Sequence, residues 1–274
     1  MSREAKEFAH FRRIGVPGGL SGLSARYRSH AFAPHSHETF VIGVFDAGVS
    51  VVRCEREVAT LSSANVLLIN PGAIHSAHGA TSEGRTYRGI YPSMELVADA
   101  LPEVPESQRR FDRTAIADPR VVAAVRADMD ILFSDDEPAS HEEAVIRMIG
   151  RLWHAAGAPR PETVTREPAR ELDRVRELIA DSADELVSLR ELAAEAGLSK
   201  YHLIRAFSRR FGLTPYAYFL ERRVERARQL FDRGGRPAAV AAACGFADQS
   251  HLTRHFKRIV GVTPGEYAAT VSAH

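Results

Sequence analysis

Three histidines in the first third of the chain are suited to bind an organic ligand or a metal ion. His35 and His37 stand two positions apart in APHSHETF, and His75 ends the segment NPGAIH. Residues two apart in a strand share one face, so the first pair is predicted to point the same way. Three readings remain open: an organic-ligand pocket, a divalent metal bound by three imidazoles and water, and a local structural role. We take the organic-ligand pocket as the prediction.

The rest of the sequence shows no second constellation for chemistry. No Ser-His-Asp spacing, phosphate-binding glycine loop or paired carboxylates occur. Cys54 and Cys244 have neither metal-type spacing nor a disulfide framework, so both are predicted to be buried free thiols. No apolar run reaches membrane-spanning length, and the N-terminal segment lacks the apolar region of a secretory signal. We therefore predict a cytoplasmic protein that is not an enzyme, with no catalytic residues, no cofactor and no membrane contact.

Short strands are predicted to position the histidines. Stretches rich in β-branched and aromatic residues, punctuated by Gly, Asn, Asp and Pro, indicate an antiparallel barrel or sandwich. They cover residues 9–18, 23–32, 39–57, 66–72 and 85–91. Further side chains that could complete a pocket are Phe40, Ile42, Tyr87 and Tyr91.

Two amphipathic helices are predicted after the strands. Residues 117–134 repeat apolar side chains at helical spacing, and Asp118 followed by Pro119 reads as an N-cap with proline at the first helical position. Residues 140–156 place Ile146, Ile149, Leu152 and Trp153 on one face. These helices could cover the barrel or pair with a second copy of the chain.

The chain is predicted to divide at residues 158–169, which contain three prolines, several charges and no periodicity. Residues 1–157 form the predicted ligand-binding domain, whose helices could pair with a second copy of the chain, and residues 170–274 form an all-helical domain. The fold class is therefore multidomain α+β. Net charge is +1 for the whole chain, but the C-terminal region is basic and the N-terminal region acidic. That asymmetry is a weak indication of nucleic acid at one end.

The C-terminal region contains the same element twice. Residues 199–219 and 248–268 both carry His-Leu-x-Arg-x-Phe followed by Gly-x-Thr-Pro-x-x-Tyr. In each copy a short helix, a turn and a capped second helix give helix-turn-helix geometry, whose second helix fits the major groove of DNA. The predicted buried pairs are Leu203 with Phe207 and Leu252 with Phe256. The predicted outward residues include Tyr201, Ile204, Arg205 and Arg209 in the first copy and Gln249, Ser250 and Arg254 in the second.

Residues 172–267 closely resemble the DNA-binding domain of the AraC/XylS family of transcription regulators. The resemblance covers LRELAAEAGLSKYHLIRAF, GLTPYAY with RVERARQLF, and AAACGFADQSHLTRHFKRIVGVTPGEY. It implies that Tyr201, Ile204 and Arg205 of the first helix read DNA. In the second helix it implies the same for Gln249, Ser250, His251 and Arg254. Ile204 departs from the polar residue common at its place, so it could meet a thymine methyl, or the first helix could read less sequence.

The histidine pattern resembles a cupin barrel, and it is also similar to the N-terminal sensor barrel of AraC-type regulators. Cupin enzymes usually add a Glu four or five residues after the histidine pair, where this chain has Val41 and Ile42, and Glu38 points to the wrong face of a regular strand. The leading hypothesis is therefore a regulator of operator DNA controlled by a small-molecule effector. The resemblance also implies a homodimer and contact with RNA polymerase. The alternatives are a cupin-type metal-dependent enzyme or metal sensor fused to a DNA-binding module, and an architectural DNA-binding protein without an effector.

Overall fold

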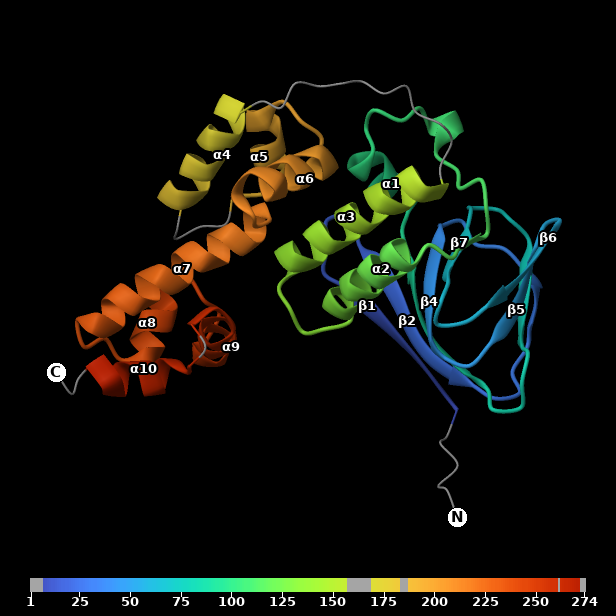
Figure 1. Cartoon of the computed structure of the whole chain (residues 1–274), viewed down its shortest axis with the longest axis horizontal. Coiled ribbons are helices and arrows are strands. Elements are labelled where there is room, and N and C mark those ends of the chain that lie inside the picture. The colour runs from blue at the N-terminus through green and yellow to red at the C-terminus, as the bar shows by residue number, and fades with distance from the viewer. Residues whose placement is uncertain (1–6, 157–168, 183–186, 261, 272–274) are drawn as a thin grey trace, which may run out of the picture. The chain divides into compact units, whose positions relative to one another are not determined.

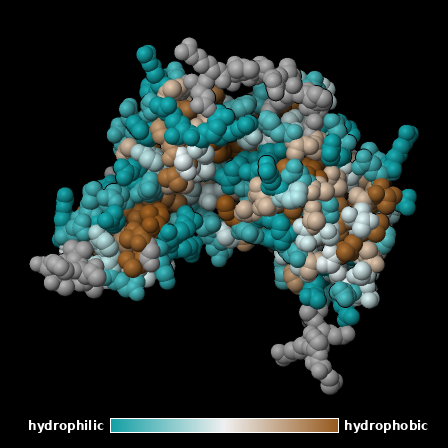
Figure 2. All heavy atoms as spheres, viewed as in Figure 1, coloured by the Kyte–Doolittle hydropathy of each residue, from teal (hydrophilic) through white to brown (hydrophobic). Residues whose placement is uncertain are grey.

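The computed structural model describes residues 7–156, 169–182, 187–260 and 262–271. The chain forms two compact units, residues 1–164 and 165–274, and each is described by itself. The linker predicted at residues 158–169 lies outside the described residues except for Ala169. Both units show a mainly hydrophilic surface in the view of Figure 2, with hydrophobic residues in separate patches. No helix of the described residues is long and apolar enough to cross a membrane.

The first unit is built on two antiparallel sheets that face each other (Figure 1). The larger sheet has the order β1-β2-β9-β4-β7-β10 and the smaller one β3-β8-β5-β6. Strands of the larger sheet are β1 (Phe8–Ile14), β2 (Leu20–Tyr27), β9 (Arg85–Tyr91), β4 (Val41–Ala47), β7 (Val66–Ile69) and β10 (Ala115–Ile116). Those of the smaller sheet are β3 (Phe32–His35), β8 (His75–Gly79), β5 (Ser50–Cys54) and β6 (Glu57–Leu61).

One apolar cluster joins the two sheets. Val41 and Phe45 of β4 pack in the same buried cluster as Val52 of β5 and Leu61 of β6. Cys54 belongs to this cluster, and both Cys54 and Cys244 are buried free thiols, as predicted. The barrel-like fold predicted from the strand pattern is confirmed, although β8 and β10 lie outside the predicted strand segments, and β3 and β6 each share only their first residue with one. These strands are short and carry polar or small residues that give no clear alternation.

Three α-helices and a short 3-10 segment complete the first unit (Figure 1). They are α1 (Met94–Ala100), η1 (Glu106–Gln108), α2 (Pro119–Leu132) and α3 (Pro138–Ala156). Asp118 caps α2 by accepting hydrogen bonds from the backbone N–H groups of Arg120 and Val121, with Pro119 at the first helical position, as predicted. The buried side of α2 includes Val125 and Met129.

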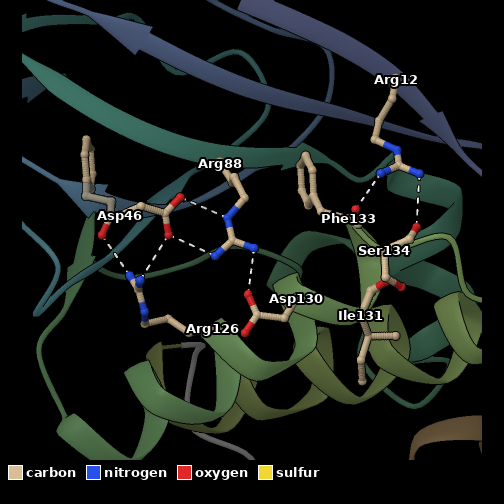
Figure 3. Close-up of polar contacts among 9 residues, drawn as sticks. Arg12, Asp46, Arg88, Arg126, Asp130, Ile131, Phe133 and Ser134 are labelled. Carbon is tan, nitrogen blue, oxygen red and sulfur yellow. Dashed lines mark hydrogen bonds and ion pairs between the residues drawn. The ribbon is translucent and has the colours of Figure 1, made fainter. Parts of the chain in front are cut away.

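Ion pairs hold α2 on the outer face of the larger sheet (Figure 3). Arg88 of β9 contacts Asp46 of β4 through two hydrogen bonds of 3.0 and 2.9 Å and reaches Asp130 of α2 at 2.8 Å. Arg126 of α2 donates to the same Asp46 carboxylate at 3.0 Å and to the Phe45 carbonyl at 2.8 Å. The bidentate geometry of the Arg88–Asp46 pair fixes the orientation of both side chains.

A buried carboxylate joins α2 to α3. Asp128 is 2% exposed, and its two oxygens accept from Arg147 and Arg151 of α3, both at 2.5 Å. The two guanidiniums stay partly accessible, so the pair of arginines keeps some solvation while it compensates the buried charge.

The second unit is helical throughout its described residues. It contains α4 (Ala169–Asp181), α5 (Leu189–Ala196), α6 (Lys200–Phe211), α7 (Pro215–Asp232), α8 (Pro237–Ala243), α9 (Gln249–Val260) and α10 (Pro264–Val271). The predicted caps are present. The side chains of Ser199, Thr214 and Asp248 accept backbone N–H bonds at the starts of α6, α7 and α9.

Asp128→Ala is expected to lower the free energy of unfolding by about 3 kcal/mol, because it leaves two arginines beside the core without their acceptor. Urea titration of the full chain, followed by the fluorescence of the single tryptophan, buried Trp153, measures the change in this unit. The control is Asp130→Ala, whose side chain is 70% exposed and whose loss should cost less than about 1 kcal/mol. Equal losses for the two variants would contradict the role given to Asp128.

Candidate functional site

A cavity of about 430 Å³ lies between the two sheets of the first unit. Alternation along the strands decides which side chains reach it. From β4, Val41 and Phe45 line the cavity. Phe40 and Ile42, which the sequence also suggested, are fully buried but do not line it. From β9, Tyr87 and Tyr91 line it, in agreement with the pocket suggested from the sequence.

The three predicted histidines converge at this cavity. Ligand atoms of His35, His37 and His75 all lie within 4.8 Å of one another. Ring centroids are 4.3 Å apart for His35 and His75, 5.1 Å for His37 and His75, and 4.9 Å for His35 and His37. The predicted His-x-His strand is wrong in one respect. β3 ends at His35, so His37 reaches the cluster from the connection that follows rather than from the strand. His78 lies on β8 and is exposed.

Backbone carbonyls orient two of the three rings. Nδ1 of His35 lies 2.8 Å from the Ala33 carbonyl oxygen, and Nδ1 of His75 lies 3.0 Å from that of Ala73. A carbonyl oxygen only accepts, so each Nδ1 carries the proton and donates it. Each Nε2 is then left with a lone pair. Such tautomers suit either a metal ion or the N–H or O–H group of a ligand.

Burial favours the neutral form of four titratable side chains of the cavity, His37, His75, Tyr87 and Tyr91. Burial lowers the pKa of His37 and of His75, and the neighbouring histidines lower both further. Burial raises the pKa of Tyr91 to about 12 and raises that of Tyr87 still further. The cavity is therefore an apolar and aromatic space with neutral hydrogen-bonding groups.

One permanently charged side chain lines this cavity, and it was not among the residues predicted. Arg85 opens β9 and is 2% exposed. Its position follows from the pattern RTYRGIY. Residues 85, 87 and 91 share a strand face, so the two tyrosines already suggested for the pocket imply that Arg85 points the same way. This alternation could have identified Arg85, but an arginine at the end of a strand is ordinarily assumed to be exposed.

The histidine cluster has no carboxylate partner among the described residues. Glu38 is exposed, and Val41 and Ile42 stand where a cupin carboxylate would follow. The site can therefore offer three imidazoles to a ligand or metal, with no carboxylate completing the cluster in the part of the chain that the structure describes.

The first helix-turn-helix of the second unit consists of α5 and α6. Gly197 adopts φ 62° at the end of α5, the left-handed conformation that the turn requires. Leu203 and Phe207 are fully buried, as predicted. Arg205 and Arg209 are exposed on α6.

Tyr201 and Ile204 differ from their predicted outward position. The exposed fraction is 7% for Tyr201 and 1% for Ile204. Ile204 lies three residues before Phe207 and Tyr201 three before Ile204, so both extend the apolar stripe of α6 along one side. The outward arc of this helix is narrower than the sequence pattern suggested.

The second helix-turn-helix consists of α8 and α9. Gln249, Ser250 and Arg254 are exposed, in the outward positions expected from the sequence. His251 was expected to read DNA but is 8% exposed. Its Nδ1 accepts the backbone N–H of Ala247 at 3.3 Å, and its ring meets the edge of Phe246. These contacts place His251 in the turn of the motif, where it supports the start of α9.

Comparison with known proteins assigns a family to each unit. A model described as the AraC-like ligand binding domain matches residues 17–156, and one described as a helix-turn-helix domain matches residues 192–270. The HTH-type transcriptional regulator YbfI of Bacillus subtilis is 30% identical over 81% of this chain and 81% of its own length. The HTH-type transcriptional regulator Rv1931c of Mycobacterium tuberculosis is 40% identical over 28% of this chain and 30% of its own.

Among solved structures, an AraC-type transcriptional regulator from Chromobacterium violaceum is 28% identical. The match covers 38% of this chain and 94% of that one, with a TM-score of 0.36. The match of the ligand-binding model to more than half of the chain, and the full-length likeness to YbfI, show the family. The chain belongs to the AraC family of transcription regulators, with a ligand-binding domain followed by a helix-turn-helix DNA-binding domain.

Proposed function

We propose that this regulator reads operator DNA with α6 and α9 and is controlled by a small organic effector bound in the barrel cavity. The cavity is the single observation that carries the effector part of the proposal. Its volume of about 430 Å³ lies in the range of small-molecule sites, about 300–1,000 Å³. An architectural DNA-binding protein without an effector has no need of such a space. His35, His37 and His75 are the proposed effector-binding histidines.

The proposed DNA-reading groups are the exposed polar side chains of the two recognition helices. Arg205 and Arg209 serve on α6, and Gln249, Ser250 and Arg254 serve on α9. In the major groove arginine forms two hydrogen bonds with guanine, and glutamine forms two with adenine, so these residue types can distinguish base pairs. Tyr201 and Ile204 are buried, so they would contact DNA only after a rearrangement that exposes them. His251 acts on DNA through its support of α9.

The proposed setting is the cytoplasm, and the proposed role excludes catalysis. Regulators of this family act on DNA, and the histidine cluster lacks the carboxylate that acid–base chemistry at this site would need. Contact with RNA polymerase, as the family implies, remains part of the proposal.

Arg254→Ala is expected to weaken binding to the operator by about 1–3 kcal/mol and to leave binding to random DNA nearly unchanged, because the lost group reads a base edge. Fluorescence anisotropy with labelled operator and scrambled duplexes at fixed salt measures both. Arg233→Ala removes the same charge from an exposed position at the end of α7, outside both recognition helices, and is the matched control. An equal loss on the two DNAs for Arg254→Ala would show that the residue holds phosphate instead.

A second candidate function is metal sensing, which the geometry of the three histidines favours. Their donor atoms lie within 4.8 Å of one another, and the carbonyl bonds of His35 and His75 leave Nε2 able to coordinate. Three imidazoles with an open position form an established set for Zn²⁺ and similar ions. A metal held here would add a point to which an effector oxygen could bind.

For the metal-sensor candidate, the expected result is about one metal ion per chain after purification without a histidine tag or chelator. Inductively coupled plasma mass spectrometry measures the content. His75→Ala should abolish it, and His78→Ala, which removes an exposed histidine from the same strand, should leave it unchanged. A metal-free wild-type protein that also takes up no Zn²⁺ on titration contradicts this candidate and leaves the organic effector site.

Dimerisation is proposed through α2. Its apolar side, with Val122, Val125 and Met129, is buried, while Arg120, Ala123 and Ala127 are exposed on the opposite side. Small residues in such a stripe allow a second helix to approach closely.

Sedimentation velocity at micromolar concentration is expected to show a dimer for the wild type and a monomer for Ala127→Glu, because the new carboxylates would face each other across the interface. Exposed Ala239→Glu, on α8 of the second unit, is the control and should stay dimeric. A wild-type chain that sediments as a monomer would remove the proposed interface.

A further inference from the structure

Arg85 is a buried cation whose hydrogen-bonding capacity is only partly used. It is 2% exposed and lines the cavity. Nη2 donates to the His30 carbonyl oxygen at 3.0 Å, but Nη1 has no hydrogen-bond partner among the described residues. A guanidinium has five N–H groups and stays protonated in proteins. An unsatisfied N–H on a buried charge is costly, so it calls for an explanation.

The described part of the chain supplies no carboxylate in direct contact with this guanidinium. No carboxylate of the described residues forms an ion pair with Arg85. Glu7 acts on it through space, but Glu7 is exposed and its Oε1 accepts the backbone N–H groups of Arg28 and Ser29. Asp128 elsewhere in the same unit shows the contrast, since two arginines neutralise that buried charge. Burying one sign of charge without the other is a cost that a bound ion can offset.

Aromatic rings hold the guanidinium in place beside the cavity. Its central carbon lies 5.6 Å from the ring centre of Tyr27 and 6.0 Å from that of Phe32. Gly79 leaves room on another side, because a Cβ there would stand 3.3 Å from Nη1. The charge is therefore preorganised, which lowers the ordering cost when a ligand binds.

The same rings connect Arg85 to the histidine cluster. Phe32 contacts Arg85 at one side, and its ring centroid lies 5.9 Å from that of His35 at the other. The cavity thus has a cationic donor in one part and neutral imidazole acceptors in another, with apolar and aromatic walls between them. A molecule that satisfies this arrangement has an anionic group and an apolar or aromatic body.

We propose that the effector is an organic monocarboxylate whose carboxylate pairs with Arg85 and whose apolar body fills the barrel cavity. This inference rests on the proposed effector site. A carboxylate matches the planar fork of arginine, and Arg85 is the one arginine or lysine among the described residues that line the cavity, so its single charge balances one negative charge. A phosphate dianion would exceed that charge. A volume of about 430 Å³ suits a body of one or two rings.

The test compares acids with their uncharged amides on the full chain. The probes are 3-phenylpropanoate, cyclohexanecarboxylate and 2-naphthoate, each beside its primary amide. Isothermal titration calorimetry at neutral pH measures the dissociation constants. The wild type is expected to bind at least one acid roughly tenfold or more tightly than its amide, because a hydrogen bond to a charged group is worth more than one to a neutral group.

Two variants assign the preference to Arg85. Arg85→Met removes the charge and keeps an apolar chain of similar reach, and Arg85→Gln keeps a donor for the His30 carbonyl. In both, the ratio of amide to acid dissociation constants is expected to fall to about one. Arg53→Met removes the same charge from an exposed position on β5 and should keep the wild-type ratio. Circular dichroism and Trp153 fluorescence check that each variant is folded.

The outcomes separate this inference from the proposed effector site. Equal binding of acid and amide by the wild type, or a preference that survives in folded Arg85 variants, overturns the carboxylate assignment and leaves a cavity for neutral effectors. Failure of the wild type to bind any acid or amide overturns the assignment and also counts against the proposed effector site. If Arg85→Met fails to fold, the comparison of acid with amide in the wild type still tests the carboxylate assignment.

Discussion

Alternation of side chains along β4 and β9 is the constraint on which the first unit depends. The two strands pair antiparallel, with Phe45 opposite Tyr87, and both rings line the cavity 5.9 Å apart. The next residue of each strand, Asp46 and Arg88, points to the other face and binds α2 (Figure 3). Phe45 and Tyr87, which line the cavity, are thus each followed in sequence by a residue that contacts α2 or its ion pairs. An effector that displaces either ring bears directly on these ion pairs, and it shifts a population only to the extent that it binds one arrangement better.

Phe45 shows how short this connection is. Its ring faces the cavity, and its carbonyl oxygen accepts a hydrogen bond of 2.8 Å from Arg126 of α2. Small changes in a packed wall are not absorbed locally, because protein interiors are close-packed and resist deformation. In the proposed mechanism, cavity occupancy would therefore act on the position of α2, and with it on the face proposed for dimerisation.

Sequence alone predicted the elements whose signals are local. Ser199, Thr214 and Asp248 are capping residues directly before periodic helices, and the positive φ of Gly197 follows from the tight turn. The sequence also predicted that His35, His37 and His75 belong to one site, because their residue type and spacing fit a common pocket. What it could not give depends on register and on tertiary contacts. Phe40 and Ile42 were suggested as pocket residues because the strand register, which decides which face a side chain lies on, was unknown. The burial of His251 could not be predicted because its contact with Phe246 crosses the turn.

The two ends of the cavity constrain each other chemically. A metal ion would use the Nε2 lone pairs of the histidines and bring a second positive charge into a barrel that already holds Arg85. An apolar wall compensates neither charge, so a metal makes an anionic effector more necessary rather than less. Without a metal, the same lone pairs accept hydrogen bonds from a ligand, and Arg85 alone demands the anion. With or without a metal, Arg85 still lacks an anionic partner, so a preference for acids does not by itself show whether a metal is bound. The carboxylate assignment holds in either case, because it depends on the unpaired guanidinium and not on what the histidines bind.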